Sequence, residues 1–325
     1  MKSLSINEEE FIPYYNTGYE DNTKKNIDYR IFRARPIVKL KDSSGYVVIN
    51  IQLLCERVFN SLYFDFAPLL NGREDSVGLY DLNKGFVEKI LFRTTFFRCI
   101  PTSQFTYPSR NSAVEKEDSH EPDFYCRFQD NLIIAECKAI KMNGEIRDDG
   151  DYSRLLEELH EKLVLKTKNL DSQRKKFKGP KPIGLGQLVY HIDKIDTDEF
   201  QWDKDIPEAV VYYPLIVFED VRLLQPGLLS LFNRWFNELL ANRQELTHIS
   251  CLPVMAVSIN TLFLYDALIR KRGLTRIINK FVAEYSLLDA NGTIRLVEDA
   301  NFDAYLRMNT LKLKKANFIG KWLTS

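Results

Sequence analysis

Residues 121–141 read EPDFYCRFQDNLIIAECKAIK and contain two β-rich runs that are separated by the turn-forming residues Gln-Asp-Asn at 129–131. This pattern predicts a β-hairpin. Along its second strand Leu132, Ile134, Glu136 and Lys138 point to one side, and the residues between them point to the other. Both sides are mostly apolar, so we expect the strand to be covered on both faces.

The register of this hairpin decides which side chains meet. If 129–130 is the loop, Asp123 lies directly opposite Glu136. If 130–131 is the loop, Asp123 faces Lys138, and Glu136 is its diagonal neighbour. Either register gathers the two acids and the lysine on one face.

An acid and a lysine near the end of a buried strand are costly unless they have partners. Cross-strand neighbours have Cβ atoms roughly 4.5 to 5.5 Å apart, so Asp123 and Glu136 can share one cation. Carboxylate oxygens at about 2.0 to 2.1 Å are typical of Mg²⁺, and the ammonium of Lys138 can stabilise the negative charge of a phosphate under attack. The cluster therefore indicates metal-assisted phosphoryl chemistry.

The residues Pro122, Asp123, Glu136, Cys137 and Lys138 resemble the signature of the PD-(D/E)xK nuclease superfamily. Pro-Asp and the acid-any-Lys pattern each occur once in the chain. The resemblance implies an α/β fold with a restriction-endonuclease-like core, an α-β-β-β-α-β mixed sheet flanked by helices. It also implies that Asp123 and Glu136 bind Mg²⁺, with Mn²⁺ as a substitute, and that Lys138 is catalytic. The alternative is an ordinary salt-bridged hairpin.

The superfamily usually carries a further acid on the helix before its first strand. Glu88, in KGFVEKILF, is the candidate third metal ligand, and Glu56 is a weaker rival. The alternative for Glu88 is a solvated charge on a surface face.

A helix after the motif often contacts nucleic acid in this superfamily, and GLGQLVYHIDK resembles it. Gln187 and Tyr190 are the candidate contacts, and they share one stripe with His191 and Lys194. The spacing departs from the QxxxY of the exonuclease branch. Tyr190 and His191 can instead pack under the sheet, and we interpret His191 and His120 as structural.

A basic run, RKKFKGPKP, precedes this helix and supplies Lys175, Lys176 and Lys178 as candidate phosphate contacts. Such contacts are independent of base sequence and sensitive to salt. A solvated helix end that complements the helix dipole is the alternative.

The rest of the chain predicts three regions. Residues 1–77 form an amino-terminal α/β segment, 78–258 the nuclease core, and 259–325 a mainly helical extension. Within the core and extension we expect an extended run FRCIPTSQF, a long helix over 152–177, a helix near 187–195, and a final long helix beginning near Leu262.

Composition restricts the classes of protein. The 325 residues carry 45 basic and 45 acidic side chains, so nucleic-acid binding would depend on a local patch. The five cysteines include no CxxC pair, which argues against a disulfide framework or a zinc cluster, and Cys126 and Cys137 are expected in the core. No apolar stretch is long enough to span a bilayer, which predicts a cytoplasmic protein with no membrane partner.

These observations predict a Mg²⁺-dependent nuclease that acts on nucleic acid, with DNA favoured over RNA and internal cleavage favoured over exonuclease action. A role in restriction or antiphage defence is slightly favoured over DNA repair or a mobile element. The alternative is a catalytically silent nucleic-acid-binding or scaffold protein that keeps the fold. A protein partner or a homo-oligomer is compatible with the long helices after residue 226.

Overall fold

The computed structural model of the chain describes residues 5–7, 9, 35–41, 44–51, 53–54, 87–88, 90–100, 121–140, 142–143, 146, 151–166, 181–243, 249–288 and 294–311. The chain divides into two compact units, Met1–Leu82 and Asn83–Ser325. Residues 259–325 therefore belong to the same unit as the predicted core. Each unit is described by itself.

The first unit contains a small three-stranded sheet of β1 (Ser5–Asn7), β2 (Ile37–Lys39) and β3 (Tyr46–Val48). Strand β2 is central, parallel to β1 and antiparallel to β3.

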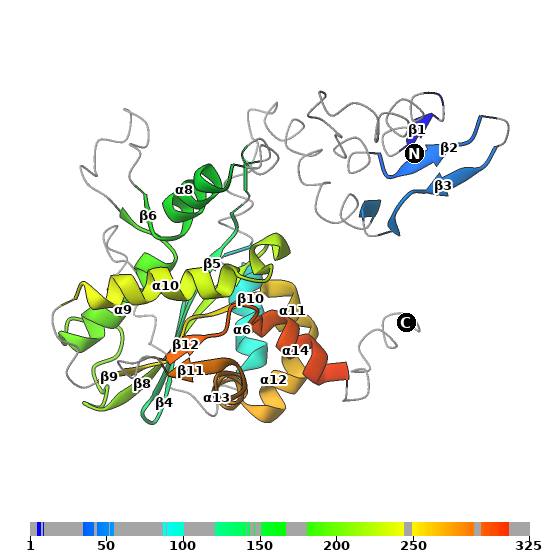
Figure 1. The fold of residues 1–325 in the computed structure, drawn as a ribbon. Coiled ribbons are helices and arrows are strands. Elements are labelled where there is room, and N and C mark those ends of the chain that lie inside the picture. The colour runs from blue at the N-terminus through cyan, green and yellow to red at the C-terminus, as the bar shows by residue number, and fades with distance from the viewer. Residues whose placement is uncertain are drawn as a thin grey trace, which may run out of the picture. The chain divides into compact units, whose positions relative to one another are not determined.

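The second unit is built on a five-stranded mixed sheet of β4 (Phe124–Phe128), β5 (Asn131–Lys138), β8 (Val210–Phe218), β9 (Ile249–Cys251) and β10 (Met255–Ser258). The order is β10-β8-β5-β4, and β9 also pairs with β8. Only the β4–β5 pair is antiparallel. The carboxyl ends of β5, β8 and β10 therefore meet at one edge of the sheet (Figure 1).

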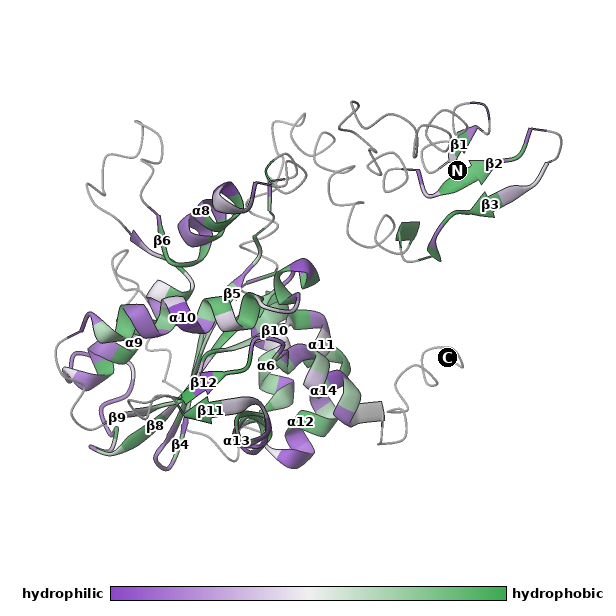
Figure 2. Ribbon diagram, in the orientation of Figure 1, coloured by the Kyte–Doolittle hydropathy of each residue, from purple (hydrophilic) through white to green (hydrophobic). Residues whose placement is uncertain are grey.

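Helices cover both faces of this sheet. On one face lie α9 (Leu185–Asp196) and α10 (Leu228–Ala241), which contact each other (Figure 1). On the other face, Phe96 of α6 (Arg93–Cys99) packs on Phe124 of β4, and Asn279 of α13 (Leu274–Tyr285) bonds to Tyr213 of β8. Figure 2 shows the sheet as mainly hydrophobic and the helices with mixed faces. A mixed α/β architecture, as predicted, is confirmed.

The remaining described elements of this unit are α8 (Tyr152–Leu163), β6 (Leu165–Lys166), β7 (Lys181–Pro182), η3 (Val221–Leu224), α11 (Ile259–Leu264), α12 (Asp266–Arg272), β11 (Ser286–Leu288), β12 (Ile294–Leu296) and α14 (Phe302–Leu311). Among the described helices, none is long and apolar enough to cross a membrane.

Several element boundaries differ from the predicted ones. The helix predicted over 152–177 ends at Leu163, because the chain then pairs with β7. The final long helix is three helices that begin at Ile259 and are interrupted at Tyr265 and Gly273. Residues 97–99 of the predicted extended run are helical, and 101–105 lie outside the described residues.

Candidate active site

The β4–β5 hairpin has the first of the two predicted registers. Phe128 pairs with Asn131, which leaves 129–130 as a two-residue turn. Asp123, one residue before β4, therefore lies opposite Glu136.

The ammonium of Lys138 lies between these two carboxylates. Lys138 Nζ donates to Glu136 Oε2 at 3.0 Å and lies 3.8 Å from Asp123 Oδ2. The same Asp123 oxygen accepts a hydrogen bond of 2.9 Å from the backbone N–H of Cys137. The hairpin thus joins all three predicted catalytic side chains in one cluster, which we call the acid–lysine cluster.

This cluster lies at the carboxyl edge of the parallel strands. Lys138 ends β5 and pairs with Phe218, which ends β8, and Phe218 pairs in turn with Ser258 at the end of β10. Open α/β sheets bind their ligands at this edge, because the loops that leave the strands there form a crevice.

Burial differs sharply within the cluster. The side chain of Glu136 is 0% exposed and that of Lys138 is 10% exposed. Asp123 is 28% exposed. Asp123 is therefore the member of the cluster that an approaching ligand meets first.

The cluster also shifts the pKa values of its members. Burial and the negative charge of Glu136 raise the pKa of Asp123 well above its ordinary value, against the opposing ammonium of Lys138. Burial also raises the pKa of Glu136, but Lys138 and His191 outweigh it and bring that pKa down to about 2. Burial lowers the pKa of Lys138, but Glu136 and Asp123 outweigh it and raise that pKa above its usual value. Glu136 and Lys138 are therefore both charged.

His191 of α9 is the residue that the sequence interpretation undervalued. Its side chain is fully buried, and its Nε2 lies 3.3 Å from Glu136 Oε1. Neither ring nitrogen, nor Glu136 Oε1, has a hydrogen bond to any described residue. The structure thus agrees that His191 packs under the sheet, but it packs against a predicted metal ligand. The sequence signal that could have identified it is its position one helical turn after Gln187, on the same side of the predicted helix.

Two glycines bring the start of α9 close to the chain that follows α8. Gly184 has φ +54°, and a Cβ there would lie 2.9 Å from the carbonyl oxygen of Leu163. A Cβ on Gly186 would lie 2.3 Å from the carbonyl oxygen of Val164. Larger residues would push α9 away, and with it His191.

Glu88 lies near enough to act on the cluster through its charge. It belongs to a π-helical stretch, described at residues 87–88 and 90–92, that leads into α6, and its side chain is half-buried. Its negative charge raises the pKa values of both Asp123 and Lys138. π-helical turns are frequent at functional sites.

The two predicted nucleic-acid contacts on α9 have different surroundings. Gln187 Oε1 accepts the backbone N–H of Gly184 at 3.0 Å, so this side chain caps its own helix. Tyr190 is half-buried, with Lys194 Nζ 5.7 Å from its ring centroid. Lys175, Lys176, Lys178, Glu56 and His120 lie outside the described residues.

The acid–lysine cluster offers carboxylates to a divalent cation but no third acidic ligand at coordinating distance among the described residues. Among the residues that the structure describes, no three His, Cys, Asp or Glu side chains are arranged to hold a metal ion. The predicted shell of Asp123, Glu136 and Glu88 therefore stays a prediction. Asp123 and Glu136 nevertheless offer two carboxylates. Oε1 of Glu136 makes no hydrogen bond within the described residues, although His191 Nε2 lies 3.3 Å from it. Carboxylate oxygens of this kind fit a cation ligand.

Comparison of the chain with protein families, with curated proteins and with solved structures gave no match.

Proposed function

We propose that this chain is a Mg²⁺-dependent nuclease that hydrolyses phosphodiester bonds of nucleic acid, with DNA as the preferred polymer and internal cleavage as the mode. One observation carries the proposal: two carboxylates from adjacent strands flank one lysine ammonium at the carboxyl edge of a parallel sheet. A hairpin held only for stability has no need of a buried ammonium at this edge.

In this proposal Asp123 and Glu136 would hold a Mg²⁺ ion, and the ion would supply Lewis-acid chemistry at the phosphoryl oxygen. Lys138 stabilises the negative charge that develops as a water oxygen attacks phosphorus and the bond to the leaving oxygen breaks. The backbone N–H of Cys137 fixes the Asp123 carboxylate. His191 limits the positions open to Glu136.

The arrangement of elements supports a restriction-endonuclease-like core for the proposed enzyme. Helix α6 precedes the β4–β5 hairpin, and α9 leads by a crossover into β8, parallel to β5. The strand expected between α6 and β4 would fall within 101–120, outside the described residues. A role in restriction or antiphage defence, and a protein partner or second copy, belong to the same proposal.

The test is to incubate the protein with Mg²⁺ or Mn²⁺ and with linear duplex, circular duplex, single-stranded DNA and RNA. We expect circular DNA to be cut, and EDTA to abolish cleavage. Asp123→Asn and Lys138→Met should each lower the rate by at least about 100-fold, since each removes charge that acts in the transition state. Full activity in both variants would refute the site.

Matched controls separate the cluster from general charge effects. Glu157→Gln removes an exposed acid on α8, and Lys204→Met removes an exposed lysine in the loop before β8. Both should keep the wild-type rate.

The second candidate function is a catalytically silent nucleic-acid-binding scaffold. It is favoured by the enclosure of Glu136, whose charge the neighbouring lysine already neutralises. Salt-dependent binding of DNA without cleavage under either metal would support this alternative.

A further inference from the structure

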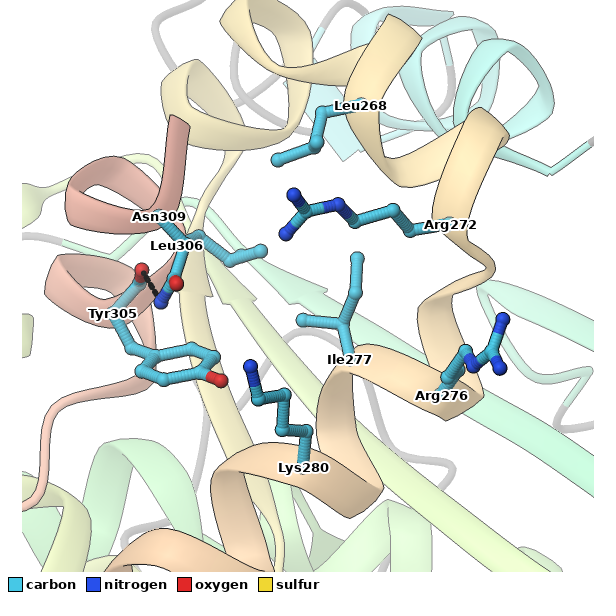
Figure 3. Close-up of a pocket in the computed structure, with 8 residues that line it drawn as sticks. All are labelled: Leu268, Arg272, Arg276, Ile277, Lys280, Tyr305, Leu306 and Asn309. Atoms are coloured by element: carbon cyan, nitrogen blue, oxygen red, sulfur yellow. Dashed lines mark hydrogen bonds between the residues drawn. The ribbon is translucent and has the colours of Figure 1, made fainter. Parts of the chain in front are cut away.

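Helices α12, α13 and α14 line a cavity of about 310 Å³ that is open to solvent (Figure 3). None of its lining residues belongs to the acid–lysine cluster. The volume lies at the lower end of the range for small-molecule sites, which is roughly 300 to 1,000 Å³.

Positive charge dominates the polar lining of this cavity. Arg272 at the end of α12 and Lys280 in α13 point into it from different sides, whereas Arg276 lies at the rim and points outward (Figure 3). No carboxylate lines the cavity, although Glu284 lies 3.7 Å from Lys280 Nζ. Within the described chain no ion pair is recorded for Arg272. The cavity is therefore complementary to an anion.

A polar and an apolar feature complete the lining. Tyr305 of α14 is buried, and its hydroxyl points toward the same space as Lys280 (Figure 3). The aliphatic side chains of Leu268, Ile277 and Leu306 form the remaining wall. Asn309 donates its amide N–H to the backbone oxygen of Tyr305 at 3.0 Å, which leaves its amide oxygen as an acceptor.

We propose that this cavity binds a nucleoside phosphate unit, with the phosphate between Arg272 and Lys280 and the base on the aliphatic wall. The site would be separate from the active site, and the proposal does not depend on nuclease activity. The same unit can be a free mononucleotide or one residue of a single strand, and the experiment below distinguishes these sources.

The chemistry of the lining favours this ligand over a simple anion. An arginine fork and an ammonium together match the oxygens of a phosphate, which accepts several charge-assisted hydrogen bonds. The aliphatic wall adds a surface for a flat, weakly polar ring, and the acceptor of Asn309 can take an N–H of a base. Inorganic phosphate would use only the charged half of the cavity.

The first experiment measures binding of four probes to the full-length protein by isothermal titration calorimetry at low salt. The probes are adenosine 5′-monophosphate, adenosine, inorganic phosphate and a single-stranded deoxythymidine decamer. The chain is expected to bind the mononucleotide with a Kd below about 1 mM and at least about tenfold more tightly than adenosine or inorganic phosphate. If the decamer binds more tightly than the mononucleotide, the natural ligand is a single strand. If the mononucleotide binds more tightly, the natural ligand is a free nucleotide.

The variants test the geometry of the cavity. Arg272→Ala and Lys280→Ala should each weaken binding of the tighter probe about tenfold, because each removes a charge-assisted hydrogen bond. Arg276→Ala should change it less than about threefold, since that side chain points outward (Figure 3). Glu284→Gln should leave affinity unchanged or raise it, because it removes the acid beside Lys280.

Lys271→Ala is the matched control, since Lys271 is exposed on α12 next to Arg272 and does not line the cavity. It should bind like the wild type. If Arg272→Ala does not fold, the proposal is tested by comparing the affinities of Lys280→Ala and Arg276→Ala, of which only the first should be lowered about tenfold. Three results would each overturn the proposal. The first is that neither the mononucleotide nor the decamer binds, and the second is that the mononucleotide and inorganic phosphate bind with equal affinity. The third is that Lys280→Ala and Lys271→Ala lose the same affinity.

Discussion

The acid–lysine cluster and the helical cavity both contain lysine or arginine side chains, but their charges are balanced in opposite ways. Lys138 is almost fully buried and has a carboxylate on either side. Arg272 is exposed, lines a cavity without a carboxylate, and has no ion pair recorded in the described chain. A buried charge requires an internal partner, whereas an exposed one is satisfied by water until an anion arrives. Removing the basic side chain should therefore destabilise the fold strongly in the first arrangement and hardly at all in the second.

Lys138→Met is expected to have the largest effect on the free energy of unfolding. The substitution keeps the length of the side chain but leaves Glu136 and Asp123 without their shared cation in a buried site. Removing one partner of a buried ion pair costs about 3 to 5 kcal/mol. We expect the free energy of unfolding, measured by urea denaturation monitored by circular dichroism, to fall by this amount.

Arg272→Met is the matched control in the cavity, and it should change the free energy of unfolding by less than about 0.5 kcal/mol. Comparable losses in the two variants would contradict the distinction between the two regions.

A smaller effect is expected from Mg²⁺ itself. A ligand that binds only the folded chain stabilises it by about 2.7 kcal/mol at a concentration 100 times its Kd. Mg²⁺ should therefore raise the Tm of the wild type in differential scanning fluorimetry, relative to NaCl of equal ionic strength. Asp123→Asn should remove most of this shift, and Glu157→Gln should keep it. An equal shift in Asp123→Asn would exclude Asp123 as a ligand.

Strand alternation in the sequence predicted the hairpin and the shared face of Asp123, Glu136 and Lys138, because the side-chain period of a strand is fixed. It left two registers open. The structure has the register with 129–130 as the turn, and Gln129 there has φ 54°. That conformation is unusual for glutamine, so the sequence contained no strong signal for it.

Features that depend on distant contacts could not be read from local patterns. Helix α8 ends at Leu163 because the next residues pair with Lys181 and Pro182, beyond any helical periodicity. The contact of His191 with Glu136 joins α9 to β5, and its sequence position shows only that it shares a helix stripe with Gln187. By contrast, the break between α12 and α13 lies at Gly273, which has φ +82°. Glycine commonly ends a helix in this conformation, so the sequence contained a local signal for this break, although a single long helix was predicted.

A balanced charge at the opposite end of the hairpin provides an intermediate case. Asp203 accepts hydrogen bonds from Arg127 at 2.7 and 3.1 Å and from the hydroxyl of Tyr125 at 2.7 Å. Asp203→Asn removes the charge and one acceptor oxygen from a site that is 6% exposed. We expect a loss of about 2 kcal/mol at pH 7, the usual size for hydrogen bonds to a charged group. The loss is smaller than for Lys138→Met, because Lys138→Met leaves two carboxylates without a cation.

The pH dependence of this loss has a definite sign. Burial raises the pKa of Asp203, but the bonds from Arg127 and Tyr125 outweigh it and bring the pKa below its ordinary value. The stabilisation is therefore complete above the unfolded pKa of about 3.9 and disappears as the pH falls through the lower folded value. Urea denaturation from pH 7 to pH 3 should show wild type and Asp203→Asn converging at the acid end. Asp205→Asn, at an exposed neighbour, should show no such convergence.

The smallest effect is expected at the turn that sets the register of the acid–lysine cluster. Gln129 has a left-handed φ of 54° at the first position of the two-residue turn, and glycine adopts this conformation without steric cost. Gln129→Gly should therefore raise the free energy of unfolding by about 0.5 kcal/mol in urea denaturation. Gln129→Ala is the control and should give no gain, because alanine meets the same steric conflict. Since the register that pairs Asp123 with Glu136 depends on this turn, Gln129→Gly should also keep full Mg²⁺-dependent stabilisation. A loss of that stabilisation in a more stable variant would mean that the glycine turn favours the other register, with Asp123 opposite Lys138.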